Sequence, residues 1–77
     1  MIVDDETKIR NGLCNFFPWK EIGFEVVAEA KHGKQALEYI VKQPIDVVLC
    51  DIKMPVMSGI ELAQELYHRK NKAKMVF

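Results

Sequence analysis

Four runs of apolar residues punctuate the chain, and β-branched and aromatic residues are frequent in them, which predicts strands. These runs cover residues 1–3, 24–28, 45–50 and 74–77. The apolar residues of the third run follow one another without alternation. That pattern is typical of a parallel strand that is covered on both faces.

Three stretches between these runs space their apolar residues three and four positions apart, which predicts amphipathic helices. The helices are expected over about residues 6–17, 34–42 and 59–69. Their expected inward residues are Ile9, Leu13, Phe16 and Phe17 in the first, Ala36, Leu37, Ile40 and Val41 in the second, and Ile60, Ala63, Leu66 and Tyr67 in the third. Asp4 or Asp5 is the expected N-cap of the first helix, Pro18 ends it, and Trp19 is expected to cover that end.

The regular alternation of strand and helix predicts the α/β class with a mostly parallel sheet. Connections between parallel strands of one sheet are right-handed. Ligands of such sheets bind beyond the carboxyl ends of the strands. Polar residues that directly follow a predicted strand are therefore the first candidates for a functional site.

Composition narrows the class of protein. A chain of 77 residues is one small domain at most. Its eleven basic and eleven acidic residues cancel, so charge gives no reason to expect contact with nucleic acid or an anionic membrane. No apolar run approaches the roughly 20 residues of a membrane span. Cys14 and Cys50 are interpreted as packed, reduced thiols, which favours a cytoplasmic location.

Two of the predicted strands stop abruptly at aspartate. Asp4 and Asp5 follow the first strand, and Asp51 follows the third. If these strands lie side by side and parallel, the three carboxylates gather at one edge of the sheet, where they repel one another and need a cation. Oxygen-only ligands favour Mg²⁺ or a similar hard ion. Such a site could take a phosphoryl group onto one of its own carboxylates.

Each aspartate also has a simpler interpretation when it is taken alone. Asp4 and Asp5 could only cap a helix, and Asp51 could only start a turn. The occurrence of all three aspartates at the ends of strands that are expected to be neighbours favours the metal site. Asp46 stands at the opposite end of the third strand and is not expected to be a ligand.

Several motifs together resemble the receiver domain of two-component response regulators. They are Val3-Asp4-Asp5-Glu6, Asp51 closing an apolar strand, Lys53-Met54-Pro55, and Gly59. The stretch at 18–27 further resembles receivers that are fused to AraC-type DNA-binding domains. The resemblance covers residues 1–77 and implies a flavodoxin-like, doubly wound parallel sheet that breaks off after the start of strand 4. We therefore expect residues 1–77 to be a partial receiver domain without strand 5 and the last two helices.

The resemblance also implies roles for particular residues. Asp51 falls at the phosphoacceptor position, and Mg²⁺ would be held by Asp4, Asp5, Asp51 and the backbone carbonyl of Lys53. The implied partners are a sensor histidine kinase, which phosphorylates Asp51, and an output domain of the same protein that binds DNA and regulates transcription. The resemblance also implies that the protein can form a homodimer. The segment itself is expected to be no enzyme and to contact neither DNA nor a membrane.

The family also uses a Ser or Thr just past strand 4 and a Lys at the end of strand 5, and both positions lie beyond Phe77. We therefore expect a metal site that is partly formed but weakly switchable, in a segment that either belongs to a longer chain or is unstable alone. An alternative function is an interaction or dimerisation module of the same fold that is never phosphorylated. A metal-dependent phosphohydrolase is disfavoured, because Lys53 stands where that chemistry needs a second aspartate as acid and base.

Overall fold

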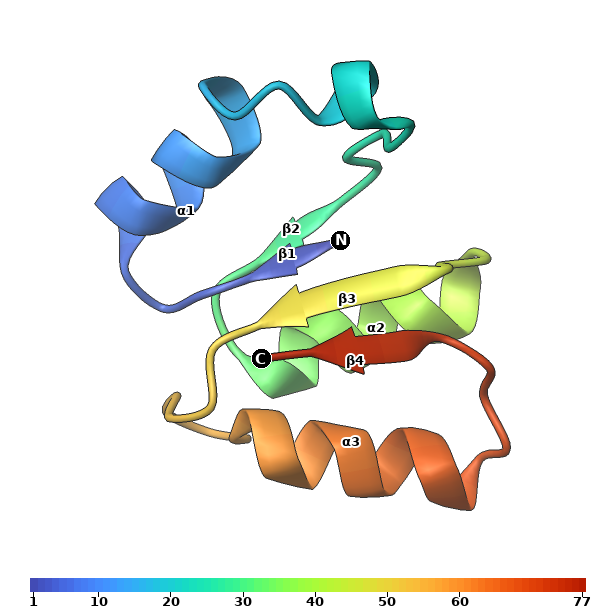
Figure 1. Ribbon diagram of the computed structural model, residues 1–77. Coiled ribbons are helices and arrows are strands. Elements are labelled where there is room, and N and C mark those ends of the chain that lie inside the picture. Colours follow the sequence, from blue (N-terminus) through green and yellow to red (C-terminus); the bar gives the residue numbers. More distant parts are fainter.

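The computed structural model describes residues 1–77 and shows a parallel sheet with helices on both sides (Figure 1). The strands are β1 (Ile2–Val3), β2 (Glu29–Ala30), β3 (Val47–Cys50) and β4 (Lys74–Val76). Their order in the sheet is β2-β1-β3-β4, and every neighbouring pair is parallel. The predicted α/β fold with a parallel sheet is confirmed.

Three α-helices and one short 3₁₀ helix connect the strands. Helix α1 (Thr7–Asn15) lies on one side of the sheet, whereas α2 (Gly33–Lys42) and α3 (Gly59–His68) lie on the other (Figure 1). The 3₁₀ helix η1 (Trp19–Ile22) follows α1, and the indole Nε1 of Trp19 donates a 2.6 Å hydrogen bond to the carbonyl of Leu13. Trp19 thus covers the end of the first helix, as the sequence predicts.

The core lies between the sheet and the helices α2 and α3. Successive side chains of a strand point to opposite faces, and Val3, Val48 and Cys50 are buried on this side of β1 and β3. Leu62 and Ala36 meet them from the helices, and both are fully buried. This packing fixes β1 and β3 side by side, which is the arrangement that the candidate site needs.

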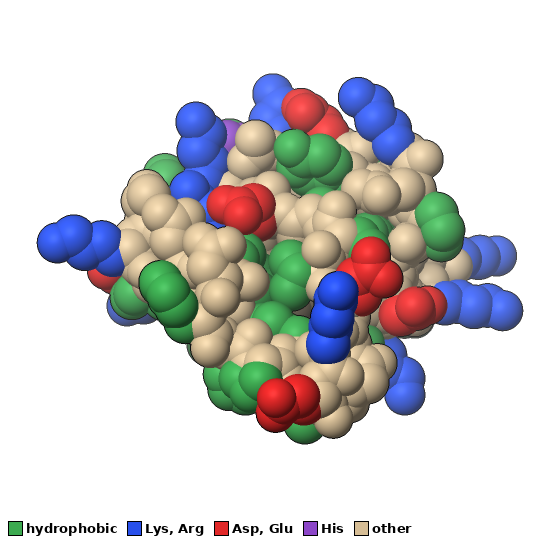
Figure 2. Space-filling model, turned by 90° about the horizontal axis from the view of Figure 1, so that it is seen from above, with side chains coloured by type: hydrophobic (Ala, Val, Ile, Leu, Met, Phe, Trp, Pro, Cys, Tyr) green, Lys and Arg blue, Asp and Glu red, His purple; other side chains and the backbone are tan.

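The opposite face of the sheet is less covered. Ile2, Val47, Leu49 and Val76 point to the side of α1 and line an apolar hollow of about 190 Å³ together with Trp19, Phe24, Val26 and Met1. Seen from this side, apolar side chains lie open in the hollowed middle of the surface, and most charged side chains project around it (Figure 2). Helix α1 itself has no buried residue.

The predicted strand at 24–28 is wrong. The strand is Glu29–Ala30, and residues 24–28 form no strand. The amide of Phe24 donates a hydrogen bond to the carbonyl of Trp19, and the carbonyl of Ala28 accepts one from the amide of Ile2. β1 offers only two residues for pairing, and they pair with Glu29 and Ala30. The high β-propensity of residues 24–27 therefore has no neighbouring strand to act on.

Predictions about the N-cap and the end of the first helix, and about inward residues of all three helices, also fail. Neither Asp4 nor Asp5 caps α1, because Glu6 is the N-cap residue and makes no side-chain cap. The helix ends at Asn15, and three of its four predicted inward residues are exposed, namely Ile9, Phe16 and Phe17. In α3 the inward residues are Leu62 and Leu66, whereas Ile60 and Tyr67, which were predicted to be inward, are exposed, as is Val41 of α2.

The loop between β3 and α3 is held at both of its ends by close backbone contacts. The amide of Gly59 donates to the carbonyl of Ile52 at 2.8 Å, and the amide of Gly33, at the start of α2, donates to the carbonyl of Met57 at 3.0 Å. A Cβ atom on either glycine would overlap main-chain oxygen, that of Asp51 at position 59 and that of Met57 at position 33. Glycine is therefore required at both positions.

Candidate metal centre

The register of the sheet brings the acidic ends of β1 and β3 together. Val3 is paired with Cys50, so the residues that follow them, Asp4 and Asp51, leave the sheet at the same edge. The amide of Asp51 donates to the carbonyl of Val3 at 2.9 Å, and the amide of Asp4 donates to the carbonyl of Ala30 at 3.0 Å. Both aspartates are therefore fixed by main-chain bonds to the neighbouring strand.

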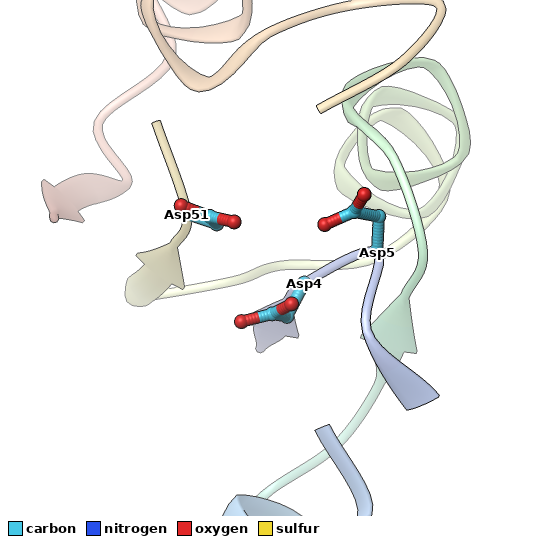
Figure 3. A group of neighbouring side chains, drawn as sticks. All are labelled: Asp4, Asp5 and Asp51. Atoms are coloured by element: carbon cyan, nitrogen blue, oxygen red, sulfur yellow. The ribbon is translucent and has the colours of Figure 1, made fainter. Parts of the chain in front are cut away.

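The carboxylates of Asp4, Asp5 and Asp51 converge at this edge (Figure 3). One oxygen of each lies within 4.8 Å of the others. In an octahedral Mg²⁺ shell with bonds of 2.0–2.1 Å, ligand oxygens are about 2.9 Å apart when adjacent and about 4.1 Å apart when opposite. All three donors are carboxylate oxygens, which hard divalent cations prefer, and they are grouped closely enough to serve one ion directly or through water.

The three aspartates differ in how firmly they are held. Asp4 Oδ1 accepts a 2.8 Å hydrogen bond from the amide of Glu6, which leaves its second oxygen free. No hydrogen bond or salt bridge holds the exposed carboxylate of Asp5. Asp4 and Asp51 are half-buried and line a hollow of about 350 Å³ beside α1. Asp5 is the carboxylate with most freedom to adjust to a ligand.

Lys53 lies two residues past Asp51 in the exposed loop before α3. Its carbonyl accepts no main-chain hydrogen bond, so it is available as a further oxygen ligand. Val56 in the same loop has a left-handed φ of 70°, and Ser58 begins α3 with a capping box in which its hydroxyl accepts from the amide of Glu61. The loop therefore has a defined path away from the acidic edge.

A buried thiol lies next to Asp51 in the sequence and contacts its carbonyl. Cys50 is 3% exposed, and its Sγ donates to the carbonyl of Asp51 at 3.1 Å. Burial, together with the nearby carboxylates of Asp51 and Asp4, raises the pKa of Cys50 to about 11. The thiol is thus neutral at physiological pH and adds no negative charge to the acidic edge.

One cation touches the backbone of the acidic edge, and the sequence analysis missed it. Arg10 Nη1 donates to the carbonyl of Asp4 at 2.7 Å, and Arg10 Nε donates to Glu29 Oε1 at 3.1 Å. Its side chain is only 13% exposed. Arg10 lies on the least exposed stripe of α1, three and four positions before Leu13 and Cys14. A charged residue on that stripe is the sequence feature that could have indicated a structural role for Arg10.

Comparison with known protein families identifies the family of this chain. Residues 1–77 match the response regulator receiver domain along their whole length. The chain belongs to the response regulator receiver domain family. Receiver domains in general use Mg²⁺ for phosphorylation, and the carboxylates of Asp4, Asp5 and Asp51 in this receiver are grouped closely enough to hold a metal ion.

Among curated proteins, the receiver resembles the transcriptional regulatory protein HptR of Staphylococcus aureus, with 37% identity over 68 residues. That match covers 88% of the chain and 27% of HptR. The chain therefore spans about a quarter of the length of this relative.

Two solved structures share the fold. The REC domain of AraT, a response regulator from Geobacillus stearothermophilus, is 38% identical with a TM-score of 0.84, over 96% of this chain and 57% of that one. A two-component transcriptional regulator AraC from Clostridium phytofermentans is 36% identical with a TM-score of 0.86, over 99% of this chain and 59% of that one. Both support the predicted resemblance to receivers of AraC-type regulators.

No helix of this receiver is both long and apolar enough to cross a membrane.

Proposed function

We propose that this receiver accepts a phosphoryl group on Asp51 in a magnesium-dependent reaction with a sensor histidine kinase. The observation that carries the proposal is the convergence of Asp4, Asp5 and Asp51 at the ends of two paired strands. In this proposal Asp5 and Asp51 bind the ion directly, Asp4 binds it through water, and the carbonyl of Lys53 completes the protein ligands. Residues 1–77 then form the first part of a receiver domain.

The chemistry needs few groups, because phosphoryl transfer depends mainly on alignment and on charge. A bound Mg²⁺ would supply positive charge that offsets the repulsion between the Asp51 carboxylate and the phosphoryl oxygens. An Asp51 carboxylate oxygen attacks phosphorus, and the bond from phosphorus to the donor nitrogen breaks as the imidazole takes the electron pair. The product is an acyl phosphate whose phosphoryl oxygens carry roughly 1.5 to 2 negative charges in place of the single charge of the carboxylate.

The wider role follows from the relatives. HptR and the Clostridium protein are described as transcriptional regulators. We infer that Asp51 phosphorylation controls an attached, DNA-binding output domain, with homodimerisation as one route of control. A cytoplasmic location fits this role and is supported by the two free cysteines, Cys14 and Cys50.

The test is incubation of the purified protein with acetyl phosphate and MgCl₂, followed by intact-mass spectrometry. We expect one added phosphoryl group, its loss in Asp51→Asn, and its retention in Asp46→Asn. Asp46 is the matched control because it is exposed at the opposite end of the same strand region. Absence of incorporation in the parent protein would instead support the unphosphorylated interaction module.

Metal binding is tested separately by calorimetric titration with MgCl₂. Asp5→Asn removes one negative charge and one strong ligand, and we expect the affinity for Mg²⁺ to fall at least tenfold, as is usual when ligation is disturbed. Unchanged affinity in Asp5→Asn would refute the assignment of the metal ligands.

A further inference from the structure

Arg10 is the one charged side chain that donates a hydrogen bond to the backbone of the acidic edge, at the carbonyl of Asp4. Its guanidinium bridges two elements, donating from Nη1 to the carbonyl of Asp4 after β1 and from Nε to the carboxylate of Glu29 at the start of β2. The planar guanidinium has fixed donor directions, so two such bonds define its position. The Arg10 side chain is only 13% exposed, so its bond to Asp4 is packed, whereas Glu29, with 47% of its side chain exposed, faces solvent.

The carbonyl that Arg10 holds belongs to the peptide bond between Asp4 and Asp5. A peptide unit is planar, so the direction of its carbonyl fixes the direction in which the next residue leaves. The amide of Asp4 is already held by Ala30 and its carboxylate by the amide of Glu6. With its carbonyl held as well, Asp4 is fixed at three points, and Asp5 leaves this residue in one direction.

We propose that Arg10 is a positioning residue that orients the Asp4–Asp5 peptide so that both carboxylates face Asp51 and a bound divalent cation. This inference rests on the proposed metal site. Arg10 would then act as an outer-shell partner of the metal ligands. Substitution of such partners typically lowers metal affinity about 10–100-fold.

If Arg10 acted only through its charge, its removal would change metal affinity in the opposite direction, so the two roles can be told apart by experiment. A cation near a metal site repels the metal, so its removal alone would strengthen binding. If Arg10 acts by orientation, its removal weakens binding despite the gain in negative charge. Octahedral Mg²⁺ tolerates misplaced ligands less well than Ca²⁺, which accepts six to eight oxygens in flexible geometry. Loss of orientation should therefore reduce Mg²⁺ affinity more than Ca²⁺ affinity.

The experiment is calorimetric titration of the purified protein with MgCl₂ and with CaCl₂. In Arg10→Gln we expect Mg²⁺ affinity to fall about tenfold and Ca²⁺ affinity to fall less. Arg69→Gln is the matched control, because Arg69 pairs with Glu65 on α3 at 3.0 Å and half of its side chain is exposed. Its Mg²⁺ affinity should equal that of the parent.

A second variant covers the case in which Arg10→Gln does not fold. Arg10→Lys keeps the charge but has no planar fork to bridge both acceptors. Orientation predicts weakened Mg²⁺ binding in Arg10→Lys, whereas a role in charge alone predicts no change. Thermal melting of each variant, recorded without metal, separates loss of fold from loss of affinity.

The outcomes distinguish this inference from the proposed function. If the parent binds Mg²⁺ and Asp5→Asn does not, but Arg10→Gln and Arg10→Lys bind as well as Arg69→Gln or more tightly, the positioning role is refuted and the metal site stands. Equal losses of Mg²⁺ and Ca²⁺ affinity would also refute it. If Asp5→Asn binds as the parent does, the metal site itself fails.

Discussion

The main-chain amide of Asp51 donates a 2.9 Å hydrogen bond to the carbonyl of Val3. This bond continues the pairing of β1 with β3 past their last paired residues, Val3 and Cys50. A shift of one residue in this register would turn the side chains of the shifted strand to the other face. The convergence of the three carboxylates thus depends on the packing that sets the register.

Gly59→Ala should destabilise the protein by about 1–3 kcal/mol, the range for forced overpacking. The new Cβ would overlap the carbonyl oxygen of Asp51 and lie 2.9 Å from the Phe77 ring. Urea unfolding measures the loss. Gly12→Ala is the control, because no atom lies within 4 Å of its new Cβ in α1 and alanine favours a helix by about 1 kcal/mol. Equal stability of Gly59→Ala and the parent would contradict the close approach.

Ser58→Ala should cost about 0.5–2 kcal/mol, because the hydroxyl that accepts from the amide of Glu61 caps α3. Ser58→Asp should restore most of the stability, since a carboxylate caps equally well. Chemical denaturation of the three proteins gives the comparison. If alanine and aspartate behave alike at this position, the capping box contributes nothing.

Trp19→Phe should destabilise the protein by about 1 kcal/mol, the typical net value of one hydrogen bond. The variant loses the bond from the indole to the carbonyl of Leu13 but keeps an aromatic ring beside Phe17 and Phe24. Tyr67→Phe removes a polar group from an 81% exposed ring and should change stability by less than about 0.5 kcal/mol. Thermal melting of both variants measures the difference, and a Trp19→Phe variant as stable as the parent would show that the bond is not needed.

Stability should fall at alkaline pH because of Cys50. Its pKa is about 11 in the folded protein against an ordinary 9.0. The unfolded chain therefore releases this proton first, so the contribution is complete below pH 9 and is lost as pH rises through the folded value. The loss should be about 2 kcal/mol or less.

The check is urea unfolding at a series of alkaline pH values in the parent and in Cys50→Ser, whose hydroxyl does not ionise there. The decline should be shallower in Cys50→Ser. Parallel curves would show that the thiol is not the group responsible.

The fold class and the acidic site could be predicted from sequence because both depend on local patterns. Alternating apolar runs and helical stripes determine the class, and an aspartate that ends an apolar run is visible without coordinates. The family resemblance is confirmed, and the structure brings Asp4, Asp5 and Asp51 together. Their roles as ligands and phosphoacceptor stay predictions.

What could not be predicted depends on neighbours distant in the sequence. Residues 24–28 have strand-like composition, but the pairing strand β1 reaches only Glu29 and Ala30. The apolar stripe of α1 predicted burial, yet the sheet on that side leaves an open apolar hollow. The bridge from Arg10 to Glu29 spans 19 residues, and no local pattern encodes it.

The bond between Gly33 and Met57 joins the segment after Asp51 to the first turn of α2. Since a Cβ at position 33 would overlap the Met57 oxygen, the two pieces of backbone touch with no side chain between them. If phosphorylation of Asp51, as proposed, moved Met57, the movement would either break that bond or displace the start of α2. Comparison of the amide hydrogen exchange rate at Gly33 before and after phosphorylation would show which of the two happens, because a broken bond exposes this amide to solvent.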